Sequence, residues 1–305
     1  MNLTRFCKLA TAMLVGVGAA FAFGSQAPKA PESYPKGWMW EVSDGQNTIY
    51  MVGSVHMATK KMYPLPPYML KAFHEADELE VEFDVNKAMG EATQLLAQEG
   101  IYTNGDSLWK HVDAKTKADL TKYAKKNSME LDEFALMKPW LAFAVVSIPP
   151  SMKSAMNAPE GIDVYFLNHA GSKKIVNVES LEFQLKMLSS IPIKQQVELL
   201  DYTVTQPTGT GSDGTKEIES AWIAGDTKPI ESELSGSEKT YPKDLMSVER
   251  SMLEDRNPHM ADVAEKCLKS GKKCFFVVGC AHYLGPDGIV AILQKRGYKV
   301  DRVLN

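Results

Sequence analysis

The spacing of apolar positions along the chain predicts strands that are separated by helices. Short apolar runs of strand character occupy residues 38–42, 48–52, 79–83, 174–178, 274–278 and 298–303, with a turn at 44–47 between the first two. Apolar residues recur at helical spacing in residues 67–76, 181–188, 243–269 and 289–295. Strands that alternate with helices are typical of an α/β protein, so we predict a largely parallel sheet.

A long helical stretch interrupts this order in the middle of the chain. Residues 87–154 are helical in pattern throughout, and we predict that they form an insertion that walls a central cleft. Residues 203–215 are rich in Thr and Gly and predict an internal loop.

The first 22 residues have the pattern of an export signal. Arg5 and Lys8 precede an uncharged apolar run over residues 9–23, and Ala20 and Ala22 supply the small-x-small cleavage pattern. The run of about 15 residues is short for a spanning helix of ~20. We therefore expect cleavage after Ala22, a periplasmic or secreted protein, and no stable membrane span; an uncleaved anchor is the alternative. Residues 23–37 contain three prolines and predict a tether.

The amino-acid composition and net charge exclude two classes of protein. The 305 residues include 34 Lys and Arg against 38 Asp and Glu, a net charge of −4, and 44% are hydrophobic. This is enough apolar material for a sizeable core, which excludes a disordered chain. A slightly acidic balance also excludes a strongly basic nucleic-acid binder.

Three cysteines follow the export signal, and an oxidising compartment permits a disulfide. Cys267 and Cys274 flank the predicted end of a helix and the start of the next strand, so we predict that they bridge these two elements. Cys280 is then left as a thiol. The alternative is that all three are small buried hydrophobic side chains.

An internal repeat marks the candidate site. Residues 49–56, Ile-Tyr-Met-Val-Gly-Ser-Val-His, align without a gap to residues 275–282, Phe-Phe-Val-Val-Gly-Cys-Ala-His. Each copy is followed by a Pro-containing loop, a helix and a strand. We interpret the chain as two similar strand-GxxH-helix-strand halves. His56 and His282 then converge at the C-terminal edge of the sheet, across a cleft, where open α/β sheets bind ligands.

Two histidines with one or two carboxylates are typical of a hydrolytic metal site that keeps open positions. Glu80 and Glu82 alternate on the strand after the first histidine, and Glu179 directly follows the strand at 174–178. The alternatives are that the histidines cap strand ends and that the glutamates are ordinary charges. For Glu80 we favour a solvated charge at a strand edge. The other histidines lack this context and are predicted to be helix or surface residues: His74, His111, His169 and His259.

Short fragments in a specific order carry a family resemblance over nearly all of the chain after the signal. They include Trp38-Met-Trp-Glu-Val, Gly53-Ser-Val-His56, Tyr63-Pro-Leu-Pro66, Lys138-Pro-Trp140, Gly161-Ile-Asp163, Val178-Glu179-Ser-Leu-Glu182-Phe-Gln184, Arg256-Asn257 and Val278-Gly-Cys-Ala-His282. Together they resemble the TraB/PrgY/GumN family, which is similar to the Tiki membrane metalloproteases and, more remotely, to erythromycin esterases and ChaN-like haem-binding proteins. The resemblance implies a single domain over residues 38–305.

The resemblance also implies a metal-dependent hydrolase, and in particular a peptidase. His56 and His282 match the two motif histidines and Glu82 matches the acidic position, so these three are the predicted ligands of a divalent ion, Zn, Mn or Co. Glu179 and Arg256 match recurrent family positions. We assign Glu179 as the base that takes a proton from water, and Arg256 as the group that holds a substrate carboxylate or an oxyanion. A structural salt bridge is the alternative for Arg256.

Two further interpretations stay open. The protein could use the same cleft to sequester a peptide or haem without turnover, as the resemblance to pheromone-blocking and haem-binding relatives implies. It could also be a degenerate member whose histidines are structural. The Tiki-like C-terminal membrane segment is missing from this sequence, so the expected partner is a peptide or small-molecule substrate rather than a membrane-proximal one.

Overall fold

A computed structural model of the protein describes residues 33–56, 58–147, 161–205, 211–232, 234 and 242–304. The predicted export signal and its cleavage site lie outside these residues, as does most of the predicted tether. Among the helices in the described part of the chain, none combines the length and apolar character that crossing a bilayer requires.

The described strands form one six-stranded sheet in the order β4-β3-β5-β2-β1-β6. Strands β4, β3, β5 and β2 are parallel, whereas β1 is antiparallel to both β2 and β6. The predicted α/β class with a mostly parallel sheet is therefore confirmed. The strands are β1 (Met39–Ser43), β2 (Thr48–Ser54), β3 (Glu78–Val81), β4 (Lys174–Asn177), β5 (Cys274–Gly279) and β6 (Lys299–Val303).

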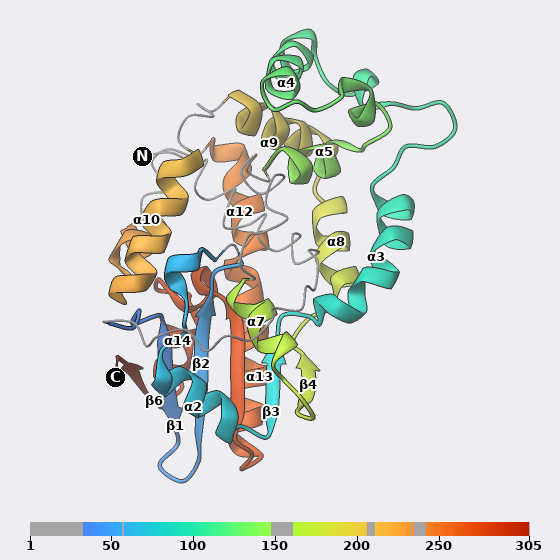
Figure 1. Cartoon of the computed structure of the whole chain (residues 1–305). Coiled ribbons are helices and arrows are strands. Elements are labelled where there is room, and N and C mark those ends of the chain that lie inside the picture. Colours follow the sequence, from blue (N-terminus) through green and yellow to red (C-terminus); the bar gives the residue numbers. More distant parts are fainter. Residues whose placement is uncertain are drawn as a thin grey trace.

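Helices cover both faces of this sheet (Figure 1). On one face, Phe73 of α2 (Pro67–Glu75) and Phe166 of α7 (Ile162–Asn168) pack against Phe275 of β5. On the other face, α13 (Asn257–Lys269) packs against β2 and β5, with α14 (Ile289–Lys295) beside it. Because helices cover both faces of β5, residues 274–278 are all buried. This explains why the sequence there is a continuous apolar run and does not alternate with polar residues.

The disulfide between Cys267 and Cys274 joins α13 to β5, with their Cα atoms 6.4 Å apart. This confirms the predicted bridge between the end of a helix and the start of a strand. Cys280 is buried and takes no part in the bridge.

The predicted insertion is mainly helical in its described part, residues 87–147, but it is not helical throughout. It contains α3 (Val85–Glu99), α4 (Ala114–Lys126) and α5 (Pro139–Ser147), joined by loops and short 3-10 turns, and residues 148–160 lie outside the description. Helix α5 packs against α9 (Ile193–Thr205), and α3 packs against α8 (Leu181–Ser189). In Figure 1 the helices α4, α5 and α9 lie beyond one end of the sheet.

The prediction of a loop over residues 203–215 is wrong for its described part. Helix α9 continues to Thr205 and α10 (Gly211–Ala224) begins at Gly211, while residues 206–210 are outside the description. Thr203 Oγ1 donates to the carbonyl of Leu199, and Thr205 Oγ1 donates to that of Asp201. These hydroxyls bond back into the helix, and the burial of Thr203 and Val204 outweighs the weak helix propensity that had suggested a loop. Helix α12 (Met246–Met252) precedes α13.

Candidate functional site

The two Gly-x-x-His segments lie side by side, because β2 and β5 are neighbouring parallel strands. Ser54 at the end of β2 is in register with Gly279 at the end of β5. The chain then leads to His56 from the first strand, and to His282 in the 3-10 turn Cys280–Tyr283 from the second. Gly53 permits this close approach, since a Cβ atom there would lie 3.1 Å from the Cβ of Cys280.

His56 is held by a carboxylate from the start of α7. Its Nδ1 lies 2.8 Å from Asp163 Oδ2, and the Ser54 hydroxyl donates to Asp163 Oδ1 at 2.8 Å. Burial alone would lower the pKa of His56, but the charge and hydrogen bond of Asp163 outweigh burial and raise it to about 9. The bond to Asp163 keeps a proton on Nδ1, so Nε2 is the nitrogen that would bind a metal. To do so, Nε2 would have to release the proton that the raised pKa retains at neutral pH.

His282 is held in the corresponding way by an amide. Asn257 Nδ2 donates to the carbonyl of Asp287 at 2.8 Å, which leaves Asn257 Oδ1 to accept from His282 Nδ1 at 2.7 Å. His282 is 1% exposed, and its Nε2 is buried without a hydrogen-bond partner. Burial, and then the charge of Arg256, lower the pKa of His282 to about 3. The ring is therefore neutral, with its Nε2 lone pair unused.

Glu82 stands between the two histidines and a buried arginine. Its Oε1 accepts from the backbone N–H of Gly279 at 2.8 Å and lies 3.8 Å from His56 Nε2. Its Oε2 accepts from Arg256 Nη2 at 3.1 Å. Burial would raise the pKa of Glu82, but the charge of Arg256 is the largest of the effects that lower it to about 2. Glu82 is thus an ionised carboxylate, which is the form that binds a cation.

Glu179 and Arg256 form a buried ion pair behind Glu82. Arg256 Nε donates to Glu179 Oε1 at 2.8 Å, and Nη2 donates to Glu179 Oε2. Gln184 Nε2 donates to both Glu82 Oε2 and Glu179 Oε2, at 3.0 Å each. Arg256 is 3% exposed. This geometry corresponds to the structural salt bridge that was the alternative for Arg256. It connects the start of α13 to the segments that follow β3 and β4.

The three predicted ligands meet around Gly279. A Cβ atom at this position would lie 3.2 Å from Glu82 Oε1, 3.4 Å from His56 Nε2 and 3.6 Å from His282 Cδ2. Their ligand atoms are not all within 4.8 Å of one another, so the three side chains would have to move closer together to bind one ion. Within the described residues, the group of metal-binding atoms that lie within 4.8 Å of one another is instead Glu80, Cys267 and Cys274.

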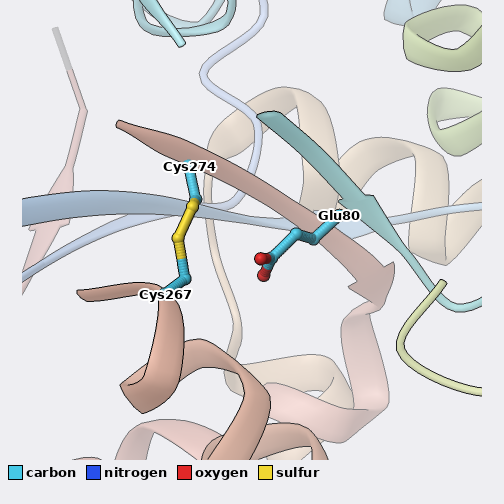
Figure 2. Close-up of side chains that lie close together, drawn as sticks. All are labelled: Glu80, Cys267 and Cys274. Atoms are coloured by element: carbon cyan, nitrogen blue, oxygen red, sulfur yellow. A yellow bond between two sulfur atoms is a disulfide. The ribbon is translucent and has the colours of Figure 1, made fainter. Parts of the chain in front are cut away.

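Glu80 is not the solvated edge charge that we predicted. Strand β3 lies inside the sheet between β4 and β5, and Glu80 is 3% exposed. Its carboxyl group points toward the disulfide between Cys267 and Cys274 (Figure 2). Burial and the neighbouring charge of Glu78 raise its pKa to about 8. The other predicted non-site histidines lie elsewhere: His74, His169 and His259 are exposed, and His111 pairs with Asp106.

Sequence reasoning did not assign roles to four side chains that orient the site: Ser54, Asp163, Gln184 and Asn257. Each falls inside a short fragment that carries the family resemblance, so the signal was present. Their partners lie far away in the chain, however; Asp163 is 107 residues from His56. Sequence spacing alone could not connect them.

A model of the TraB/PrgY/gumN family matches residues 38–302. The "Uncharacterized protein YbaP" of Escherichia coli (strain K12) is 28% identical over 163 residues, 53% of this chain and 59% of that protein. An "Uncharacterized protein" of Treponema pallidum (strain Nichols) is 20% identical over 176 residues, 55% of this chain and 51% of its own.

These alignments span little more than half the length of the curated relatives. No solved structure matches the chain. The family model, in contrast, covers both Gly-x-x-His segments, Glu82, Glu179 and Arg256 in one continuous match. The chain therefore belongs to the TraB/PrgY/gumN family.

Proposed function

We propose that this protein is an exported metal-dependent hydrolase, and specifically a peptidase, whose divalent ion is held by His56, His282 and Glu82. The observation that carries the proposal is the buried Nε2 of His282, which has a lone pair and no hydrogen-bond partner. A buried polar atom of this kind is costly unless a ligand occupies it.

The arrangement of both histidines supports the same proposal. In each ring Nδ1 is hydrogen bonded to a fixed partner, Asp163 Oδ2 or Asn257 Oδ1. His56 Nε2 and His282 Cδ2 both lie beside Gly279. Metal-binding histidines show this pattern, because the outer hydrogen bond sets the tautomer and the direction of the ring. Zn, Mn and Co all suit such a mixed histidine and carboxylate set.

A divalent ion at this position would polarise the scissile carbonyl and lower the pKa of a bound water. Other residues of the chain would orient the ligands of this ion. Asp163 and Asn257 orient the two imidazoles, while Arg256 and Gln184 hold Oε2 of Glu82 so that Oε1 faces His56. Glu179 remains our candidate base. In this structure both of its oxygens bind Arg256, so taking a proton requires this pair to open.

The proposal includes the finer architecture inferred from the repeat. We propose that the two strand-GxxH-helix-strand segments are similar halves, and that the helical insertion walls a cleft above them. The parallel pairing of β2 with β5, which brings both motifs to one edge, supports this view.

Metal analysis and peptide cleavage test the function together. Protein purified from the exporting compartment, without a His-tag or chelator, is expected to carry about one divalent ion per chain and to cleave members of a mixed peptide library. Mass spectrometry of the library distinguishes cleavage from sequestration. Protein that holds no ion and leaves every peptide intact would contradict the proposal, and peptides retained uncleaved would favour the sequestering alternative.

A further inference from the structure

A second cluster of metal-binding side chains lies away from the histidine site. Glu80 comes from β3, Cys267 from the end of α13 and Cys274 from the start of β5 (Figure 2). One ligand atom of each lies within 4.8 Å of the others. The exposed fractions are 3% for Glu80, 5% for Cys267 and 1% for Cys274, so all three side chains are in the interior.

Glu80 has no structural explanation in the oxidised protein. Its Oε2 is buried without a hydrogen-bond partner. The residue stands opposite Phe276 on an inner strand, where an apolar side chain would pack at no electrostatic cost. A buried carboxyl group with an unsatisfied oxygen costs free energy, which a bound cation would offset. The disulfide beside it is the neighbour from which such a cation would take its remaining ligands.

From this juxtaposition we infer that Glu80, Cys267 and Cys274 form a binding site for a thiophilic divalent cation, such as Zn²⁺, when the disulfide is reduced. Two thiolates and one carboxylate are ligands that Zn²⁺ accepts, with water in the fourth position. Tetrahedral ligands at Zn–S distances of ~2.3 Å lie roughly 3.8 Å apart. This spacing is within the 4.8 Å that contains one ligand atom of each residue. The two sulfur atoms, which are bonded in the oxidised protein, must move apart after reduction.

The disulfide makes binding conditional on the redox state. Reduction by a dithiol breaks the S–S bond, and the dithiol becomes a disulfide and gives one proton to each cysteine sulfur. The cation then binds both sulfurs as thiolates with release of those two protons, and Glu80 binds as carboxylate with release of the proton that its raised pKa retains near neutral pH. In the oxidised protein the two sulfur atoms are bonded to each other and cannot bind as thiolates. The site is thus closed in an oxidising compartment and opens under a dithiol reductant.

Co²⁺ serves as the probe, because cobalt bound to thiolate has a charge-transfer absorption that cobalt bound only to nitrogen and oxygen lacks. Full-length protein reduced with a phosphine and then freed of it is expected to bind Co²⁺ with this absorption. The oxidised protein is expected to lack it. Loss of an outer-shell partner lowers metal affinity by about 10–100-fold. In Glu80→Gln, which loses a direct ligand, we expect the affinity for Co²⁺ to fall at least as much. Cys274→Ser should abolish the absorption.

Matched controls separate this site from the rest of the protein. Cys280→Ala removes the remaining buried thiol and should leave the titration unchanged. His282→Ala should also keep the thiolate absorption, even though it removes a ligand of the proposed hydrolytic site. Circular dichroism of each variant checks that it folds. A reduced, folded wild type without the absorption, or a Glu80→Gln variant that titrates like wild type, would overturn the inference.

Discussion

At the scale of single residues, the candidate site depends on Gly279, because glycine has no Cβ atom and leaves space for its neighbours. Glu82 Oε1 and His56 Nε2 approach to within 3.2 and 3.4 Å of where a Cβ atom would lie. The backbone N–H of the same residue donates to Glu82, so this position both leaves space and orients the carboxylate. The strand-Gly-x-x-His pattern predicted a tight turn here, and in the folded protein the space at Gly279 also accommodates Glu82 Oε1 and His56 Nε2.

The two motif histidines are expected to act as a unit. His56→Ala and His282→Ala should each lose the metal and hydrolysis, because two remaining ligands cannot retain the ion. The double variant should be little worse than either single one, and this non-additivity is characteristic of coupled residues. Metal content by mass spectrometry and peptide cleavage provide the measurement. His74→Ala, at an exposed helix position, is the control, and a single variant that keeps its full metal content would exclude the shared site.

The raised pKa of Glu80 predicts that the free energy of unfolding depends on pH. Its pKa is raised from 4.5 to about 8 in the folded oxidised protein, so the folded state retains a proton that the unfolded state has lost. Its contribution is therefore fully favourable below pH 4.5, falls between pH 4.5 and 8, and is constant above this window. Relative to Glu80→Gln, the free energy of unfolding of the wild type should fall by a few kcal/mol across this window, at about 1.4 kcal/mol per pKa unit.

Urea unfolding of both proteins at several pH values gives this comparison. Glu182→Gln, which changes a glutamate with 55% side-chain exposure, is the matched control and should follow the wild type. A constant difference between the wild type and Glu80→Gln over the same pH range would show that the burial of Glu80 has no such consequence.

At the scale of elements, Arg256 connects the ends of three segments. It lies between α12 and α13, and its guanidinium reaches Glu82 after β3 and Glu179 after β4. These strand ends are where the sequence placed the candidate carboxylates, since parallel strands present their C-terminal ends at one edge of the sheet. That an arginine would neutralise both could not be read from spacing, because Arg256 is 174 residues from Glu82.

Removal of this arginine should be strongly destabilising. Arg256→Ala leaves two buried carboxylates without their cation, so we expect a loss of about 3–5 kcal/mol in the free energy of unfolding. The matched control is Arg250→Ala, which breaks the Arg250–Glu254 pair at side-chain exposures of 63% and 42%. An exposed pair contributes about 0–1 kcal/mol. Chemical denaturation measures both variants, and equal losses would contradict the network that we describe.

At the scale of the whole molecule, the proposed metal site would couple metal binding to folding. The proposed ligands come from segments after β2, β3 and β5, so the ion can bind only when the sheet has formed. A ligand that binds the folded state alone stabilises it by about 2.7 kcal/mol at 100 times its dissociation constant. Chelator should therefore lower the melting temperature of the wild type, as followed by calorimetry, and should leave the melting temperature of His56→Ala unchanged. An equal response from both proteins would place the ion elsewhere.

The sequence by itself indicated the α/β class, the approximate bounds of the six strands and of α2, α8 and α14, the bridge between Cys267 and Cys274 as one of two alternatives, and the family. These features depend on local periodicity, on neighbouring residues and on ordered motifs, all of which are visible along one chain. The tertiary structure decided what depends on distant partners. It placed Glu80 inside the sheet, continued a helix through Thr203, and brought Asp163, Asn257 and Arg256 to the histidines and carboxylates. Burial and ion pairing act through space, so only the folded chain specifies them.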